Sequence, residues 1–453
     1  MTDTTTSNRL REEALRLRPS AALAPVRSAA PFLACILLAV VLQVWVRPLM
    51  GDFYAKLLLD IGTNVILAVS LTMVNGFTGQ FSIGHAAFMA VGAYTSAAIV
   101  YYGSFRLWGD PLMHGGTLSA MMHGRSDPLL MSGDLLFLGS LVAGGLLSAV
   151  CGYVVGLPSL RLKGDYLAIV TLGFGEIVRV LIQSQTTDTL YDPEQIAQTP
   201  IYELPRYLGG ALGFSGLPFY SSLFWAWLAA AVTLVVAFRL KYSTYGRAFL
   251  SIREDEIAAE AMGIHTTRYK VRAFVIAAFF AGVAGGIFAH TVGVQLNAQE
   301  LGFQKSFDIL IMVVLGGLGS ISGAAIAAVI LTILPELLRQ PPCIWGWAMA
   351  FIVPAAVLWI ALSRRRVRTA VLIALALGAW EAMRWLARET GANLADYRMV
   401  LYALALIIMM IVRPQGLLGI REVWELRRPR PLAARGDRGA GGEPGTAGGR
   451  VSL

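Results

Sequence analysis

A short polar segment interrupts the apolar sequence between Gly76 and Tyr94. It contains glycines, an amide, a hydroxyl and an imidazole, at Gly79, Gln80, Ser82, Gly84 and His85. Hydrocarbon tolerates polar side chains and irregular backbone only where protein or a water-filled cavity surrounds them. Polar side chains within a span usually mark a path for something that crosses the membrane. We therefore predict that these five residues line a transport path.

A second group of polar residues lies on the apolar run 165–183. Thr171 precedes a Gly-Phe-Gly sequence, and Glu176 and Arg179 are three residues apart, so their side chains can meet on one helix face. We include Thr171 and Glu176 in the candidate path. Two alternatives stay open: Thr171 permits close helix packing, and Glu176 forms a structural ion pair. For the polar segment, the alternative is that its polar side chains form hydrogen bonds with the exposed backbone groups of a broken helix.

The longest polar connection between two apolar runs, residues 240–271, predicts a short amphipathic helix. Residues 254–262 are mostly strong helix formers, with acidic side chains at their start and Gly263 placed to stop the helix. Its apolar face consists of Ile257, Ala261 and Ile264. Such a helix can fit a groove on a partner protein and transmit a push. The alternative is an ordinary connector that lies on the membrane surface.

The composition indicates which elements must hold these residues in place. Of the 453 residues, 56% are hydrophobic and only 14% are charged, whereas soluble domains carry about 25% charged residues. Apolar runs recur along the chain, and each approaches the roughly 20 residues that cross the hydrocarbon core. The run 307–338 is too long for one upright helix and is divided by glycines between Gly316 and Gly323. We predict an all-α polytopic membrane protein with about 10–12 transmembrane or half-membrane helices.

The distribution of the net charge of +9 predicts the orientation of the chain and argues against a nucleic-acid partner. Most Lys and Arg residues lie in segments 1–30, 158–164, 239–272, 363–368 and 413–453. The positive-inside rule places these segments in the cytoplasm, together with both termini. The long loop 184–219 contains only Arg206 as a basic residue and belongs on the opposite side. The first apolar run is followed by no small-residue cleavage pattern, so we expect it to be a retained span.

Three motifs occur in a fixed order along the chain. They are Gly79-Gln80-x-Ser82-x-Gly84-His85-x-x-Phe88, Gly246-Arg247…Ile252-Arg253…Ala258-Ala259…Gly263-Ile264 and Arg413-Pro414-Gln415-Gly416-Leu417. Together they resemble the permeases of branched-chain amino acid ABC importers, most closely those of the LivM type. The resemblance covers roughly residues 55–340 and 395–419. Urea and amide permeases of the same family are close relatives.

The resemblance implies an ABC importer permease fold in the bacterial inner membrane and several partner chains. These are two ABC ATPase subunits, a homologous sister permease of the LivH type and a periplasmic substrate-binding protein. It implies ATPase coupling through Gly246, Arg247, Arg253, Glu256, Ala258, Ala259 and Gly263. It also implies alternating-access transport of branched-chain or related hydrophobic amino acids, with urea, short amides or aromatic acids as alternative substrates. The chain contains no Gly-Lys pair and hence no P-loop, so ATP hydrolysis would belong to a separate chain.

The sequence divides into five predicted parts. These are a cytoplasmic leader (1–30), a core membrane domain (31–343) with the coupling loop 240–271, an extra helical hairpin (344–392), a final span (393–419) and a disordered cytoplasmic tail (420–453). The tail is rich in Pro, Gly, Ala and Arg and cannot bury a core. The hairpin departs from the family pattern. So does Ile257, which stands where ABC importers usually have a glutamate, with Glu256 one residue earlier.

Two other classes of function were weighed. A stand-alone secondary transporter or channel would need coupling-ion carboxylates at the membrane midplane, but the candidates lie toward the ends of the predicted spans, at Asp60, Glu176, Asp308 and Glu336. An intramembrane enzyme would need a motif such as H-E-x-x-H or G-x-S-x-G, and neither occurs. We therefore predict a transporter subunit with no catalytic residue, metal or cofactor of its own.

Overall fold

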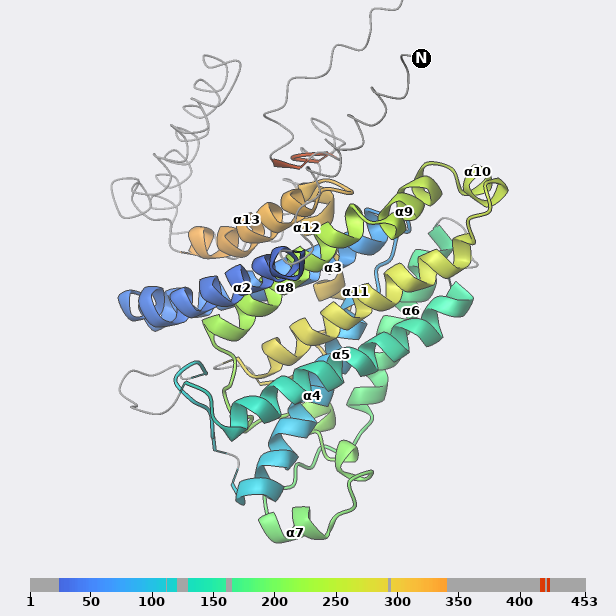
Figure 1. Ribbon diagram of the computed structural model, residues 1–453. Helices are drawn as coiled ribbons and strands as arrows, with labels where there is room; N and C mark the ends of the chain where they lie inside the picture. The colour runs from blue at the N-terminus through green and yellow to red at the C-terminus, as the bar shows by residue number, and fades with distance from the viewer. Residues whose placement is uncertain are drawn as a thin grey trace, which may run out of the picture.

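The protein folds as a bundle of α helices, which Figure 1 shows in a computed structural model. The structure describes residues 24–110, 112–119, 129–159, 165–291, 295–339, 416–419 and 422–423. Within these ranges the one β contact is an isolated bridge between Phe214 and Leu296. Among the described residues, seven helical stretches are long and apolar enough to span a membrane. The predicted all-α polytopic class is confirmed, whereas the hairpin 344–392 and most of the span 393–419 lie outside the described residues.

The helices follow the apolar runs of the sequence. The long ones are α2 (Ala24–Val41), α3 (Asp52–Asn75), α4 (His85–Trp108), α5 (Ser132–Ser159), α6 (Asp165–Gln183), α8 (Leu223–Lys241), α11 (Thr266–Ala289), α12 (Phe303–Gly316) and α13 (Ile321–Arg339). Helix α2 continues through a π turn (Leu42–Val46) and a 3-10 turn (Arg47–Leu49). The short elements are α7 (Pro193–Gln198), α9 (Thr244–Glu254), α10 (Glu256–Ala261) and two 3-10 turns (Leu204–Arg206 and Gly210–Leu212).

Helix α3 is the central element of the bundle. It packs against α8, α11, α12 and α13, and nearly all of its second half is buried. Helices α4, α5 and α11 form a second closely packed group. Small polar side chains join these helices: the Ser148 hydroxyl donates to the Phe88 carbonyl at 2.9 Å, and the hydroxyls of Ser96 and Ser140 lie 2.8 Å apart. Small residues at helix contacts are typical of membrane bundles, because they let the backbones approach.

Helices α9 and α10 lie at one end of the bundle, and α7 lies at the other (Figure 1). The long connection between α6 and α8 covers the α7 end. Arg106, near the end of α4, donates to the Ile196 carbonyl in α7 at 3.2 Å, and the Tyr94 hydroxyl donates to the Leu296 carbonyl at 3.0 Å. At the opposite end, α9 begins three residues after α8 ends, and Arg253 of α9 contacts Gly76, directly after α3, and Leu318, between α12 and α13.

Two predicted chain breaks can be compared with the structure. The run 307–338 divides as predicted, since α12 ends at Gly316 and α13 begins at Ile321. The helix expected over 254–262 is α10, but it is shorter than predicted and a separate helix, α9, precedes it. Asp255 separates the two, because its carboxylate caps α10 by accepting from the Ile257 amide at 2.9 Å. Gly263 has a φ of +84°, a left-handed conformation that ends α10 as predicted.

Candidate functional site

The polar segment Gly76–His85 connects α3 and α4, rather than interrupting a single span as the sequence suggested. The His85 imidazole Nε2 lies 2.8 Å from the Ser70 hydroxyl. Ser70 is five residues before the end of α3 at Asn75, so the segment runs back by about 8 Å alongside α3 before α4 begins. Most of the segment is buried. Its polar groups are therefore surrounded by protein, as hydrocarbon would require.

The structure brings most of the predicted path residues together. The Ile83 amide, between Ser82 and Gly84, donates to the Thr171 hydroxyl on α6 at 3.1 Å. A Cβ atom on Gly84 would lie 2.2 Å from the Thr171 carbonyl oxygen, so no larger residue fits without movement of the backbone. The Ala86 amide donates to the Ser306 hydroxyl on α12 at 3.3 Å. The segment therefore bonds to both α6 and α12, and Gly84 packs closely against Thr171.

Two side-chain amides, one in this segment and one directly before it, have unused hydrogen-bonding capacity. The Gln80 side chain is 7% exposed, and its Oε1 has no donor among the described residues. The Asn75 Oδ1 accepts from the Ser82 amide at 3.2 Å, but its Nδ2 has no acceptor there. Each buried unsatisfied group costs about 1–3 kcal/mol. Such groups can hold a bound water or ion. Among the described residues, buried unsatisfied side-chain atoms also occur in the surrounding helices, at Ser104 in α4 and Trp227 in α8.

Glu176 does not join this group. Its carboxylate accepts from the Arg179 guanidinium at 2.7 Å, and Arg179 also donates to Gln183 at 2.7 Å. Both members of the ion pair are partly exposed. Glu176 is five residues beyond Thr171, about 8 Å further along α6 toward the α7 end. The structural ion pair weighed for Glu176 is therefore the arrangement observed.

Arg253, at the end of α9, ties the predicted coupling loop to the membrane helices. Its Nη1 donates to the Gly76 carbonyl at 2.8 Å and to the Leu318 carbonyl at 3.4 Å. Gly76 starts the polar segment, and Leu318 lies in the turn between α12 and α13. A Cβ atom on Gly79 would lie 3.1 Å from the Arg253 Cγ, so the segment passes directly beside this side chain. Arg253 on α9 therefore contacts two further elements, the polar segment and the turn between α12 and α13.

Both glutamates of α10 form hydrogen bonds to α11, whereas large apolar side chains on the helix and directly after it are exposed. Glu256 accepts from the Lys270 ammonium on α11 at 2.7 Å, and Glu260 accepts from the Thr266 hydroxyl at 3.2 Å. Ile257 and Met262 are 73% and 83% exposed. The remaining predicted coupling residues divide into buried Gly246 and Ala259 and exposed Arg247, Ala258 and Gly263. The surface that α10 offers to a partner is apolar, and the predicted contact at Glu256 is occupied within the chain.

Sequence reasoning missed a buried carboxylate at the same end of the bundle. Glu422 is fully buried and pairs with Lys241, the last residue of α8. Its oxygens also accept from the amides of Ile321 and Ser322 at 3.1 and 3.0 Å, at the start of α13. Burial raises the pKa of Glu422, but the hydrogen bonds from Lys241 and Ser322 outweigh it and hold the pKa below its usual range. Glu422 was placed in the predicted tail 420–453, and only its long-range contacts reveal its role.

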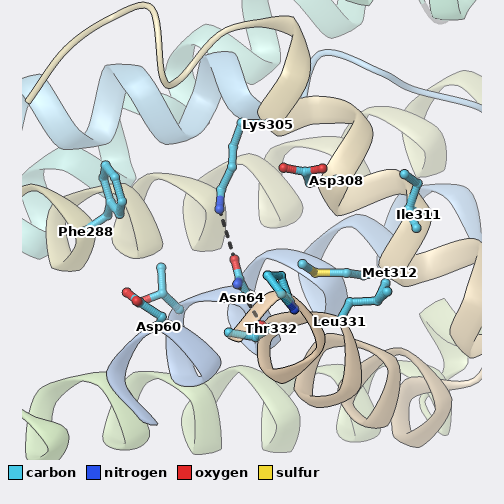
Figure 2. Close-up of a pocket in the computed structure, with 11 residues that line it drawn as sticks. Asp60, Asn64, Phe288, Lys305, Asp308, Ile311, Met312, Leu331 and Thr332 are labelled. Carbon is cyan, nitrogen blue, oxygen red and sulfur yellow. Dashed lines mark hydrogen bonds between the residues drawn. The ribbon is translucent and has the colours of Figure 1, made fainter. Parts of the chain in front are cut away.

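A second feature missed by sequence reasoning is a cavity of about 340 Å³ between α3, α12 and α13. Polar residues from three helices line it, namely Asp60, Thr63, Asn64, Lys305, Asp308 and Thr332. Figure 2 shows Lys305 extending from α12 toward Asn64 on α3, and the ammonium donates to the Asn64 carbonyl oxygen at 3.2 Å. The signal in the sequence was a lysine close to the start of a long apolar run, since charges at such positions are usually functional.

The fold and these contacts define a multi-pass membrane protein with a connected cluster of polar groups inside it, and the comparisons identify its family. Residues 53–362 match the family model described as "Branched-chain amino acid transport system / permease component". This range includes the polar segment, α9, α10 and the lining of the cavity. The chain belongs to this family.

The chain is similar to several curated permeases. It is 36% identical over 297 residues to the high-affinity branched-chain amino acid transport system permease protein LivM of Salmonella typhimurium, and 35% identical to LivM of Escherichia coli K12. Each alignment covers 61% of this chain and 61% of the relative. It is also 25% identical to LivH of Escherichia coli K12, over 61% of this chain and 81% of the relative. No solved structure matches the chain.

Proposed function

We propose that this chain is a transmembrane permease subunit of an ATP-driven importer in the bacterial inner membrane, and that it passes branched-chain or related hydrophobic amino acids. Membership of the permease family and the similarity to two LivM proteins support the substrate class. The similarity to LivH supports a homologous sister permease, with which this chain would form the path. A periplasmic binding protein would deliver the substrate to the end of the bundle that carries α7.

The contacts of α9 and α10 carry the proposal. Ile257 and Met262 are large apolar side chains that remain exposed at one end of the bundle. Exposed apolar patches rimmed by polar residues mark interaction sites on proteins. A few residues away, Arg253 bonds to the polar segment and to the α12–α13 turn. One short stretch of chain thus combines a docking surface with a rigid link to the membrane helices.

This link supports a mechanism of alternating access. Closure of two partner ATPase subunits would displace α10 through Ile257 and Met262, and α9 would move with it. Arg253 would pass the displacement to Gly76 and Leu318, and so to the starts of the polar segment and of α13. The segment would then change its contacts with α6 and α12 and open the path to the cytoplasm. In this arrangement both termini and the α9–α10 end lie in the cytoplasm.

Reconstitution of the complete transporter tests the proposal. The tagged chain is expressed with its genomic neighbours, purified and assayed for uptake of labelled L-leucine into proteoliposomes with and without ATP at the ATPase face. We expect co-purified ATPase and ATP-dependent uptake, and both should be lost in Ile257→Asp/Met262→Asp. The matched control is Ile201→Asp, a 71% exposed residue in the α6–α8 connection, which should retain both.

The same assay separates the alternatives. Transport of L-leucine by this chain alone, without any ATPase, would contradict the proposal and indicate a secondary transporter. Competition by urea, acetamide or benzoate that exceeds competition by L-isoleucine would keep the importer class and replace the substrate class.

A further inference from the structure

We propose that one side of helix α6 lines a water-filled part of the transport path, and that the sister permease forms the opposite wall. This side of the helix, the polar flank, consists of Glu176, Arg179 and Gln183. The identity of the second chain rests on the proposed function. The need for water or protein beside the flank rests on the contacts, depth and exposure of these three side chains.

The polar flank is a continuous row of hydrogen bonds along α6. The Glu176 carboxylate accepts from the Arg179 Nε at 2.7 Å, and the Arg179 Nη1 donates to the Gln183 side-chain oxygen at 2.7 Å. Gln183 donates in turn to the side-chain oxygen of Gln299, in the connection before α12, at 3.2 Å. The spacing of three and four residues keeps the three α6 side chains on one side of the helix. The row therefore runs from within α6 to the connection between α11 and α12.

Glu176 lies near the middle of α6, rather than toward its end as the sequence suggested. The part of α6 that is apolar enough to span a membrane extends from Tyr166 to Gln183 and has 18 residues, so it is about 27 Å long. The Glu176 Cα is roughly 15 Å from one end of this part and roughly 10 Å from the other. The hydrocarbon core is about 30 Å thick, and a charged side chain near its centre is costly unless protein or water surrounds it.

This chain by itself leaves the polar flank partly open. The side chains of Glu176 and Arg179 are 40% and 26% exposed, and Gln183 is half-buried. Only 22% of the α6 span is buried, compared with 83% for α3 and 72% for both α4 and α11. A lipid chain cannot form hydrogen bonds with these charges. Their open side therefore requires water or the polar surface of another protein.

The neighbouring surfaces show how far the polar flank extends around α6. On one side is an apolar face with Ile177, Val180 and Leu181, each more than half exposed, and lipid chains can cover such a face. On the other side, Gly302, which directly precedes α12, packs against Arg179: a Cβ atom on Gly302 would lie 3.1 Å from the Arg179 Cδ. Since the exposed part of the flank faces out of this chain, the opposite wall of the path has to come from a second chain.

The polar flank also leads to the polar segment. Thr171, five residues before Glu176 on α6, accepts a hydrogen bond from the Ile83 amide at 3.1 Å. A solute that moves along the flank as far as Glu176 is then about 8 Å from this contact along the helix axis. The proposed mechanism changes the contacts between the polar segment and α6, so the flank would supply the solute to the point where the path opens.

Cysteine accessibility tests the polar flank in the complete transporter. Glu176→Cys and Ile177→Cys are introduced separately into a chain whose three native cysteines are replaced by serine. Spheroplasts that contain the assembled transporter are treated with a charged, membrane-impermeant methanethiosulfonate reagent, which reaches thiols in water but not thiols in hydrocarbon. We expect Glu176→Cys to react at least tenfold faster. Ile177 is the matched control, because it is adjacent in depth and 59% exposed in this chain, but lies on the apolar face.

Two further measurements make the result specific. Gln183→Cys and Val180→Cys form a second pair that leaves the ion pair between Glu176 and Arg179 intact, and this pair decides the test if Glu176→Cys does not assemble. The Gln183 variant should again react at least tenfold faster, although Val180 is 51% exposed in this chain. A photo-crosslinking residue, introduced as Gln183→p-benzoylphenylalanine, should form an adduct with the sister permease on irradiation.

The outcomes separate the polar flank from the proposed function. Equal rates within the deciding pair, whether fast or slow, would overturn the inference, because the flank would then be no more hydrated than the apolar face beside it. Adducts with lipid alone would overturn it as well. Selective reaction of Glu176→Cys in a transporter without ATP-dependent uptake would instead refute the importer function and leave the water-lined flank standing.

Discussion

Removal of the Glu422 carboxylate should destabilise the end of the bundle that carries α9. In the native structure this fully buried group neutralises Lys241 and accepts hydrogen bonds from the amides of Ile321 and Ser322. Lys241 also donates to the Gly319 carbonyl at 2.9 Å. Glu422→Ala leaves an ammonium that is 9% exposed without its counter-ion, and it leaves two amides without their acceptor.

The magnitude follows from these lost contacts. Breaking a buried ion pair by removing one partner costs about 3–5 kcal/mol, and each buried donor left unsatisfied costs about 1–3 kcal/mol. The contributions overlap, because the same carboxylate serves all the donors. We therefore expect Glu422→Ala to lower the free energy of unfolding by about 4 kcal/mol. Lys241→Met should cost a similar amount, since it leaves the carboxylate buried without its charge partner.

This effect can be measured by unfolding the purified protein in detergent. A thiol-reactive dye then reports the exposure of the free thiols of Cys35 and Cys151. The double variant Lys241→Met/Glu422→Leu supplies the control. Because it removes both charges, it should cost at least about 2 kcal/mol less than the sum of the two single variants. A cost below about 1 kcal/mol for Glu422→Ala, or strictly additive costs, would show that the Glu422 carboxylate and Lys241 do not stabilise each other in the folded protein.

The contacts of Arg253, Gly84 and Glu422 lead to three further predictions. Arg253→Met should reduce ATP-dependent uptake at least tenfold, as expected for the loss of about 1.4 kcal/mol of coupling, whereas exposed Arg268→Met should retain uptake. Gly84→Ala should lower the free energy of unfolding by about 3 kcal/mol, while Gly173→Ala, which meets no atom within 4 Å, should change it little. Since the pKa of Glu422 is depressed in the folded protein, its stabilisation should be complete above about pH 4.5 and should be lost as the pH falls further. This last prediction is wrong if the difference in the free energy of unfolding between wild type and Glu422→Gln is the same at pH 7 and at pH 3.

Local signals in the sequence were enough to predict several elements. The glycines after Gly316 divide the last described apolar run as expected, and Gly263 ends α10. The break before α10 was missed because Asp255 was read as part of a helix, whereas its carboxylate is more favourable as an N-cap. The polar segment was correctly identified as unusual, but its course back along α3 depends on the contact between Ser70 and His85.

The remaining features depend on contacts between residues far apart in the sequence. Lys305 forms a hydrogen bond with Asn64, 241 residues earlier in the sequence, and Glu422 forms one with Lys241, 181 residues earlier. No periodicity or motif relates such pairs, so neither the cavity nor the anchoring of Glu422 could be predicted. The same limit applies to Arg253, which the resemblance implies in ATPase coupling. Its contacts with Gly76 and Leu318, 177 and 65 residues away, could not be predicted from the sequence.

The proposed coupling requires α9 and α10 to face the cytoplasm beneath an ATPase. The most direct test places one cysteine at Met262 in a chain without other cysteines and labels it with a membrane-impermeant maleimide. We expect no labelling in spheroplasts, labelling in inside-out vesicles, and protection in those vesicles when the ATPase subunits are assembled. Labelling of Met262→Cys from outside in intact spheroplasts would place α10 on the outer side of the membrane and rule out coupling to a cytoplasmic ATPase through it.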